Sequence, residues 1–183
     1  SGGAQTCVQN PSGLVSWWDG DAVSGSGVLD SGDGNNGSIE GGVTIVSGKV
    51  RNAFKFDGSS GRVTMGNPAN LNFGIGSFSL EAWFNWDGGG SINNIIRKSN
   101  YPVSGPGAGY WLRIGAGNLE FSVGETTKAE GQSIIIASVN SGVWHHVVGT
   151  KDSSGNIKLY VDGQSTGAAL RESSNTNVTS EAP

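Results

Sequence analysis

The stretch Gly76–Gly88, GSFSLEAWFNWDG, decides the fold. Its apolar residues fall on alternate positions: Phe78, Leu80, Ala82, Phe84 and Trp86. Because successive side chains of a β-strand point to opposite faces, this pattern predicts a strand with one face in a core. The intervening residues are Ser77, Ser79, Glu81, Trp83 and Asn85. This second face is polar but carries one large aromatic ring, which makes it a candidate binding surface.

The rest of the chain has the composition of a β-sheet protein. Of its 183 residues, 35% are hydrophobic, 14% are charged and 32 are glycine. This size and composition fit one domain of short strands joined by Gly-rich turns. The net charge of −4 provides no basic surface for nucleic acid. No apolar run approaches the roughly 20 residues of a membrane helix, so membrane insertion is not expected either.

Short strands are predicted along most of the chain, and no segment has sustained helical periodicity. The predicted strands are 14–19, 44–46, 53–56, 62–65, 76–88, 92–98, 109–114, 118–123, 133–138, 144–150, 157–161 and 164–170. Residues 19–42, rich in Gly, Ser, Asp and Asn, are predicted to form a long loop. The adjacent indoles of Trp17 and Trp18 suggest that the first strand is buried. This spacing of strands favours an antiparallel sandwich or barrel.

Six motifs follow one another in an order that resembles the laminin-G-like domains. They are SGLVSWW, DSGDGNNGSI, KVRNAFKFDGSSGRVTMGN, FSLEAWFNW, GVWHHVVGT and IKLYVDGQ. Laminin-G-like domains are modules of the concanavalin A-like lectin/glucanase superfamily. The resemblance implies an all-β, antiparallel two-sheet jelly-roll sandwich over residues 14–170, between an N-terminal tail, 1–13, and a polar C-terminal tail, 171–183. It also implies an extracellular or cell-surface module of the kind attached to bacterial enzymes, adhesins and surface proteins.

Members of this family continue beyond the position of Pro183 with two more strands, one of which closes a sheet. A sheet without its last strand exposes unpaired backbone groups and core side chains. We therefore expect either a fragment or a chain that another polypeptide completes; closure by the tail is the alternative. The single cysteine, Cys7, is either a free thiol or the partner of a cysteine outside this sequence.

The sequence does not predict an enzyme. Glycanases of the superfamily carry paired acids on one strand, typically as Glu-x-Asp-x-x-Glu, whereas Glu81 is the lone acid of its strand. Glu120 and Glu125 are separated by FSVG, which predicts that Glu125 lies in a loop. The two histidines, His145 and His146, lie near no nucleophile elbow. One histidine is expected to form a hydrogen bond at the edge of the core and the other to face solvent.

A calcium site is a further prediction. Calcium takes six to eight oxygen ligands, and the loop after Trp18 is rich in carboxylates and amides. From the residues alone, a calcium site and a set of Asx turns are equally good interpretations. The resemblance favours structural calcium, and the best candidate ligands are Asp19, Asp21 and Asp30.

Glycan binding is the leading functional prediction. Lectin sites combine an aromatic ring for sugar C–H groups with planar polar side chains for hydroxyls. The candidates are Glu81, Asn85, Arg97, Tyr101, Trp111 and Arg113. Trp83 belongs to the family-like EAW motif and is predicted to be a packing residue instead. The alternative function is a structural or adhesive module whose open sheet edge is completed by another chain.

Overall fold

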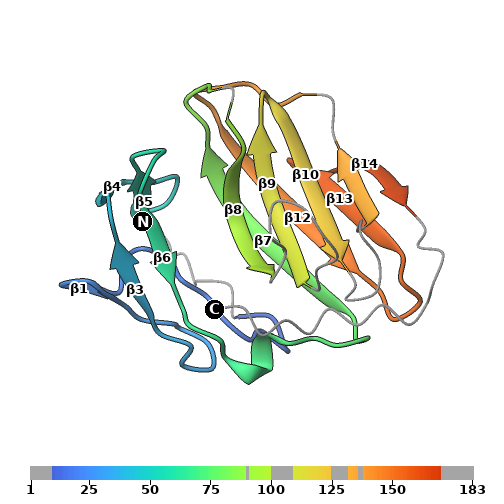
Figure 1. The fold of residues 1–183 in the computed structure, drawn as a ribbon, viewed down its shortest axis with the longest axis horizontal. Helices are drawn as coiled ribbons and strands as arrows, with labels where there is room; N and C mark the ends of the chain where they lie inside the picture. Colours follow the sequence, from blue (N-terminus) through green and yellow to red (C-terminus); the bar gives the residue numbers. More distant parts are fainter. Residues whose placement is uncertain (1–9, 90, 100–108, 125–131, 136–137, 170–183) are drawn as a thin grey trace, which may run out of the picture. The chain divides into compact units, whose positions relative to one another are not determined.

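The computed structural model describes residues 10–89, 91–99, 109–124, 132–135 and 138–169 (Figure 1). Contacts between residues divide the chain into two units, Ser1–Met65 and Gly66–Pro183. Cys7 and Tyr101 lie outside the described residues, as do most of the two predicted tails. The predicted boundaries at residues 13 and 170 therefore stay predictions.

The first unit consists of short antiparallel strands. One sheet has the order β1-β2-β3-β6, and β4 and β5 form a separate hairpin. Their bounds are β1 Val23–Ser24, β2 Gly27–Val28, β3 Gly37–Glu40, β4 Val43–Ser47, β5 Asn52–Phe56 and β6 Arg62–Thr64. The strands predicted within 44–65 are confirmed. The prediction of one long loop over 19–42 is wrong, because β1, β2 and β3 all lie inside it.

The predicted first strand, residues 14–19, is also wrong. This segment has no regular strand structure, and Trp17 is 48% exposed. Its backbone instead bonds to the loop around Asp30: Trp17 N–H donates to Asp30 Oδ1 over 2.6 Å, and Ser31 N–H donates to the Trp17 carbonyl. A side-chain carboxylate thus takes a backbone donor that a strand would give to a neighbouring strand.

A tight turn around Asp57 connects β5 to β6. The Asp57 carboxylate accepts the backbone N–H groups of Ser59, Ser60 and Gly61 at 2.8–3.0 Å. These bonds, with that from Ser59 foremost, hold the pKa of Asp57 far below its ordinary value of 3.8. The carboxylate is therefore a local template for the turn.

The second unit contains two four-stranded antiparallel sheets. Their orders are β11-β10-β9-β8 and β14-β13-β12-β7, and the first sheet lies in front of the second in Figure 1. The bounds are β7 Phe78–Asn85, β8 Asn93–Ser99, β9 Gly109–Gly115, β10 Asn118–Gly124, β11 Gln132–Ile135, β12 Trp144–Lys151, β13 Ile157–Val161 and β14 Gln164–Ala169. A short 3₁₀ helix, Ala69–Leu71, precedes them. Each of these strands was predicted, with ends that differ by a few residues.

Two tight turns fix the register of this unit. The β9–β10 hairpin turns at Ala116 and Gly117, with φ of 47° and 79°, and the β13–β14 hairpin turns at Asp162 and Gly163, with φ of 51° and 79°. Positive φ at both central residues is the conformation whose twist matches that of the flanking strands. The predicted hairpin around GAGN and the predicted turn at Asp162-Gly163 are confirmed.

The core of the second unit lies between its two sheets. It takes Phe78, Leu80 and Phe84 from β7, and the alternate residues of β9, β10, β12 and β13 fill the rest: Tyr110, Leu112, Ile114, Leu119, Phe121, Val123, Val147, Ile157 and Leu159. Both sheets therefore bury one face against the other, which is the arrangement of a sandwich. The predicted all-β, antiparallel, two-sheet class is confirmed.

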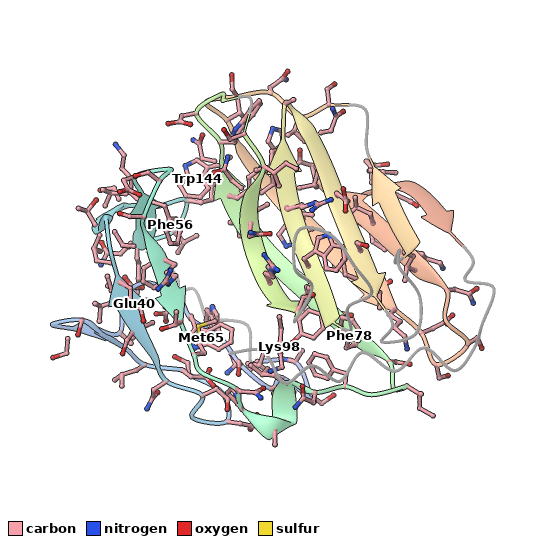
Figure 2. All side chains as sticks on the ribbon, viewed as in Figure 1. Glu40, Phe56, Met65, Phe78, Lys98 and Trp144 are labelled. Atoms are coloured by element: carbon pink, nitrogen blue, oxygen red, sulfur yellow. The ribbon has the colours of Figure 1, made fainter. Side chains whose placement is uncertain are left out.

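Two buried lysines anchor the chain that leads into β7. Lys151, at the end of β12, donates through Nζ to the carbonyls of Ile75 and Gly76, each over 3.0 Å. Lys98, on β8, donates to Asn67 Oδ1, and burial lowers its pKa. Figure 2 labels Lys98 and the first residue of β7, Phe78. These bonds place the start of the fold-deciding strand.

Candidate functional site

The outer surface of the β7–β12 pair carries the main candidate site. Opposite residues of the two strands pair as Glu81 with Val148, Trp83 with His146, and Asn85 with Trp144. These residues alternate with core residues, so they point away from the core. We call this surface the Trp83 face: Glu81, Trp83, Asn85, Trp144, His146 and Val148. Trp144, which begins β12, is labelled in Figure 2.

Trp83 is 47% exposed, which overturns the prediction that it packs in the sandwich. The inner face of β7 is already filled by its phenylalanines and by Leu80, and the period of two sends Trp83 to the other side. Its ring lies beside that of His146, with ring centroids 5.0 Å apart and planes inclined by 37°. About half of the Trp83 surface is accessible.

A hydrogen bond beside Trp83 fixes the polar part of the face. His146 Nε2 donates to Glu81 Oε1 over 2.8 Å. The Glu81 side chain is 67% exposed and that of His146 is 25% exposed. Within the described part of the chain, the second carboxylate oxygen of Glu81 and the amide of Asn85 have no hydrogen-bond partner. The face therefore offers oriented polar groups on either side of an exposed ring.

The neighbouring histidine, His145, lies on the core side of β12 and supports this face. His145 Nδ1 lies 2.8 Å from Asp162 Oδ2, and Asp162 Oδ1 accepts the backbone N–H of His146 over 2.9 Å. That backbone bond, followed by the bond from His145, lowers the pKa of Asp162. His145 is 9% exposed. The prediction of one hydrogen-bonded histidine at the core edge is confirmed, and Asp162 holds the backbone from which His146 reaches Glu81.

The other predicted ligand residues lie on the opposite sheet. Trp111 and Arg113 alternate with core residues of β9, so they point outward from that sheet. Arg97 lies opposite Trp111 on β8. The predicted set is therefore divided between two surfaces that face in opposite directions, and Glu81 and Asn85 do not share a site with Trp111.

Trp111 belongs to a compact network with Arg113 and Glu120. Trp111 Nε1 donates to Glu120 Oε1 over 2.9 Å, and Arg113 donates to Glu120 Oε2 over 2.9 Å. The guanidinium also lies 5.5 Å from the Trp111 ring centroid. Trp111 is only 8% exposed. Its indole thus offers a sugar much less accessible surface than that of Trp83.

Sequence reasoning did not assign Glu120 to this network, nor His146 to the Trp83 face. The hairpin around Ala116 and Gly117 places Arg113 opposite Glu120, which the predicted GAGN turn implies once the register is counted. The pairing of His146 with Trp83 has no such local signal, because 62 residues lie between these two positions in the sequence. Only the sheet topology brings them together.

The carboxylates of the candidate calcium ligands accept hydrogen bonds from backbone N–H groups. Asp30 accepts the N–H groups of Trp17, Gly32 and Asn35 at 2.6–2.9 Å. Although burial, the largest single influence, raises its pKa, these bonds together lower it. Asp19 Oδ1 accepts the N–H groups of the second and third residues after it. Asp21 Oδ1 accepts the N–H of Asn52, 31 residues away.

Each of these three aspartates thus accepts backbone N–H groups through at least one carboxylate oxygen, as in Asx turns. Across the described residues, no group of three or more His, Cys, Asp or Glu side chains is placed to hold a metal ion. Calcium binding by Asp19, Asp21 and Asp30 stays a prediction of the sequence.

Comparisons with known proteins agree with this architecture. No curated protein matches the sequence. Among solved structures, the binding domain of Paraclostridial Mosquitocidal Protein 1 is 17% identical, with a TM-score of 0.64 over 88% of this chain and 42% of that one. A structure of botulinum neurotoxin type C is 19% identical, with a TM-score of 0.66 over 92% and 41%. The binding domain of botulinum neurotoxin DC in complex with SialylT is 19% identical, with a TM-score of 0.57 over 83% and 38%.

The chain spans about two fifths of the length of these structures. At such identities the likeness shows the fold alone. The family assignment rests on a separate match: residues 57–182, more than half of the chain, match the model of one family. The chain belongs to the concanavalin A-like lectin/glucanases superfamily.

Proposed function

We propose that this protein is a non-catalytic recognition module that binds carbohydrate on the Trp83 face. The observation that carries the proposal is the half-exposed indole of Trp83 beside the hydrogen-bonded pair of His146 and Glu81. An exposed aromatic ring presents a flat apolar surface to sugar C–H groups. A fixed carboxylate and an amide on the same face accept and donate hydrogen bonds to hydroxyls.

The family and the structural neighbours support this proposal. The superfamily description includes lectins. Cell entry of botulinum neurotoxin type C depends on interaction with two ganglioside molecules. The binding domain of botulinum neurotoxin DC has been solved in complex with SialylT. We extend to this chain only the general class of ligand, a glycan or a cell-surface polysaccharide. The structures of the neighbours do not identify the site.

A pair of matched tryptophan variants tests the proposal. Trp83→Ala should weaken binding of a glycan that the wild-type protein captures on an array by at least about tenfold, because aromatic anchors dominate such interfaces. Trp17→Ala is the control, since Trp17 is 48% exposed, like Trp83 at 47%, but lies in the first unit. Calorimetry should show that the control binds like wild type. Unchanged binding by Trp83→Ala, with the variant folded, contradicts the proposed site.

We also propose an extracellular or cell-surface location, because glycans and polysaccharides are displayed at cell surfaces. The resemblance to modules attached to bacterial enzymes, adhesins and surface proteins supports a bacterial source. Among the described residues, no helix has the length and apolar character needed to cross a membrane.

A second candidate function is an adhesive module that another chain completes. One observation favours it: among the strands that the structure describes, β7 is the last of its sheet, and an edge strand presents backbone groups that can pair with an added strand. In that case the protein should form oligomers or capture an extended peptide. Light scattering that finds a monomer, together with glycan binding, supports the first function over this one.

A further inference from the structure

We infer that the Trp83 face continues across β12 to Tyr160 on β13, and that it binds at least two rings of an oligosaccharide chain rather than a single sugar. This inference rests on the proposed function, because it specifies the ligand of the same surface. The observation behind it is the register of three paired strands, which places a second aromatic side chain on the outer side of the sheet. Two separated aromatic contacts fit a chain of sugar rings, whereas a single ring uses only one of them.

Tyr160 shares the outer side of this sheet with Trp83. It follows Leu159, which is completely buried in the core, so the period of two sends the Tyr160 side chain outward. Its opposite residue on β12 is Val148, which is also opposite Glu81 on β7. These three residues form one row across the three strands, and Trp83 begins the next row.

The two aromatic positions are too far apart for one sugar ring. Adjacent strands lie about 4.8 Å apart, and successive residues on one side of a strand lie about 6.7 Å apart. Two strand spacings and one such step separate Trp83 from Tyr160, which gives about 12 Å between their Cα positions. A six-membered sugar ring is no wider than the aromatic ring on which it stacks. A sugar on Trp83 therefore leaves Tyr160 for a later ring of the same chain.

The positions around Tyr160 suit a chain that crosses the strands. Val148, between Tyr160 and β7, has a short apolar side chain that does not rise between the two aromatic rings. On the other side, Tyr160 is opposite Ser165 of β14, which is small and exposed. Tyr160 itself is half-buried. Its accessible part combines an apolar ring with a hydroxyl that donates and accepts hydrogen bonds.

A polar group flanks the path between the two rings. Glu81, which His146 holds through a hydrogen bond, lies two residues before Trp83 on the same side of β7. It can accept a hydroxyl of the sugar that joins the two contacts. A chain already held on Trp83 reaches Tyr160 without a second loss of translational freedom. The contact with Tyr160 should therefore raise the affinity by about tenfold.

A size-graded series of oligosaccharides tests this inference. The probes are chains of one ring to about six rings, prepared from each glycan that the wild-type protein captures on the array. Calorimetry gives the dissociation constant of each chain, and ligand-observed NMR gives that of the single ring if calorimetry is not sensitive enough. The wild-type protein should bind a chain of about three rings at least about tenfold more tightly than the single ring.

Two substitutions at one position identify the second contact. Tyr160→Ala should remove most of the gain with chain length and leave the affinity for the single ring unchanged, which also shows that the variant is folded. Tyr160→Phe keeps the aromatic ring and should retain most of the gain. Trp83→Ala should weaken the binding of every chain in the series.

The possible results separate this inference from the proposed function. Equal affinity for the single ring and for longer chains, lost in Trp83→Ala, overturns the inference and keeps the glycan site. A gain with chain length that Tyr160→Ala leaves in place overturns it too, because the second contact then lies elsewhere. So does an equal loss by Tyr160→Ala for every chain. If the array captures no glycan, or if Trp83→Ala binds as well as wild type, the proposed function itself fails.

Discussion

Adding one methyl group at Gly149 should push the two sheets of the second unit apart. Gly149 lies on β12, and a Cβ placed there would be 2.6 Å from Cγ and from Cδ2 of Phe121, on β10 of the other sheet. Carbon atoms in contact are normally about 3.5–4.0 Å apart. Gly149→Ala therefore requires a displacement of about 1 Å by the ring or by one of the sheets.

The structure leaves little freedom for that displacement. Phe121 is completely buried, and its ring meets Phe78 edge-on, with centroids 6.3 Å apart and planes at 73°. Overpacking of this kind costs about 1–3 kcal/mol. The reduced backbone freedom of alanine in the unfolded chain offsets about 0.4–1 kcal/mol of that cost. We expect a net loss of about 1–2 kcal/mol in the free energy of unfolding.

Urea denaturation followed by tryptophan fluorescence measures this loss. Gly149→Ala should lower the midpoint without changing the slope, because the surface exposed on unfolding stays the same. Gly89→Ala is the matched control, since no atom lies within 4 Å of a Cβ at that position. Phe121→Leu combined with Gly149→Ala should cost less than the sum of the two single changes. Wild-type stability of Gly149→Ala would refute the stacking of β12 on β10.

Three further predictions concern charged groups. The backbone N–H groups of Ser59, Gly61 and Ser60 lower the pKa of Asp57 below its ordinary value of 3.8. The ionised carboxylate therefore stabilises the fold fully at pH values above about 4, and this contribution is lost as the pH falls toward the lower pKa of the folded state. Asp57→Asn should therefore lose less stability than wild type between pH 7 and about pH 3 in urea titrations. Lys151→Met leaves the carbonyls of Ile75 and Gly76 without their charged donor and should cost about 2–3 kcal/mol, whereas exposed Lys158→Met should be near neutral. Asp30→Asn should lower the melting temperature equally with calcium and with a chelator, because the Asp30 carboxylate accepts backbone N–H groups. If calcium raises the melting temperature of the wild type but not that of this variant, the result supports the predicted metal site.

Sequence reasoning was most reliable where the determinants are local. The alternation in Gly76–Gly88 is confirmed residue by residue in β7, since the period of two depends only on the extended backbone. The turns at GAGN and at Asp162-Gly163 are also confirmed, because they depend on residues that accept positive φ. The family resemblance added the two-sheet arrangement, which no single motif contains.

The wrong prediction of a first strand has a clear physical origin. The carboxylate of Asp30 draws backbone donors from residues 17 to 35, and so the segment 14–19 is not a strand. No local pattern predicts which backbone donors a carboxylate will bind, because the partners are distant along the chain. The same applies to Asp21, whose partner is Asn52.

The sequence by itself thus determined that β7 has one apolar and one polar face, that the fold is all-β, and that Trp83 lies on the polar side. It did not determine whether that side is covered. Only the tertiary structure decided this, because exposure depends on what the neighbouring strands place around the ring. β12 pairs with β7 and places His146 beside Trp83, where it orients Glu81, whereas Trp111, on the outer side of β9, is only 8% exposed. Strand pairing across long sequence separations, rather than residue type, moved the candidate site from Trp111 to Trp83.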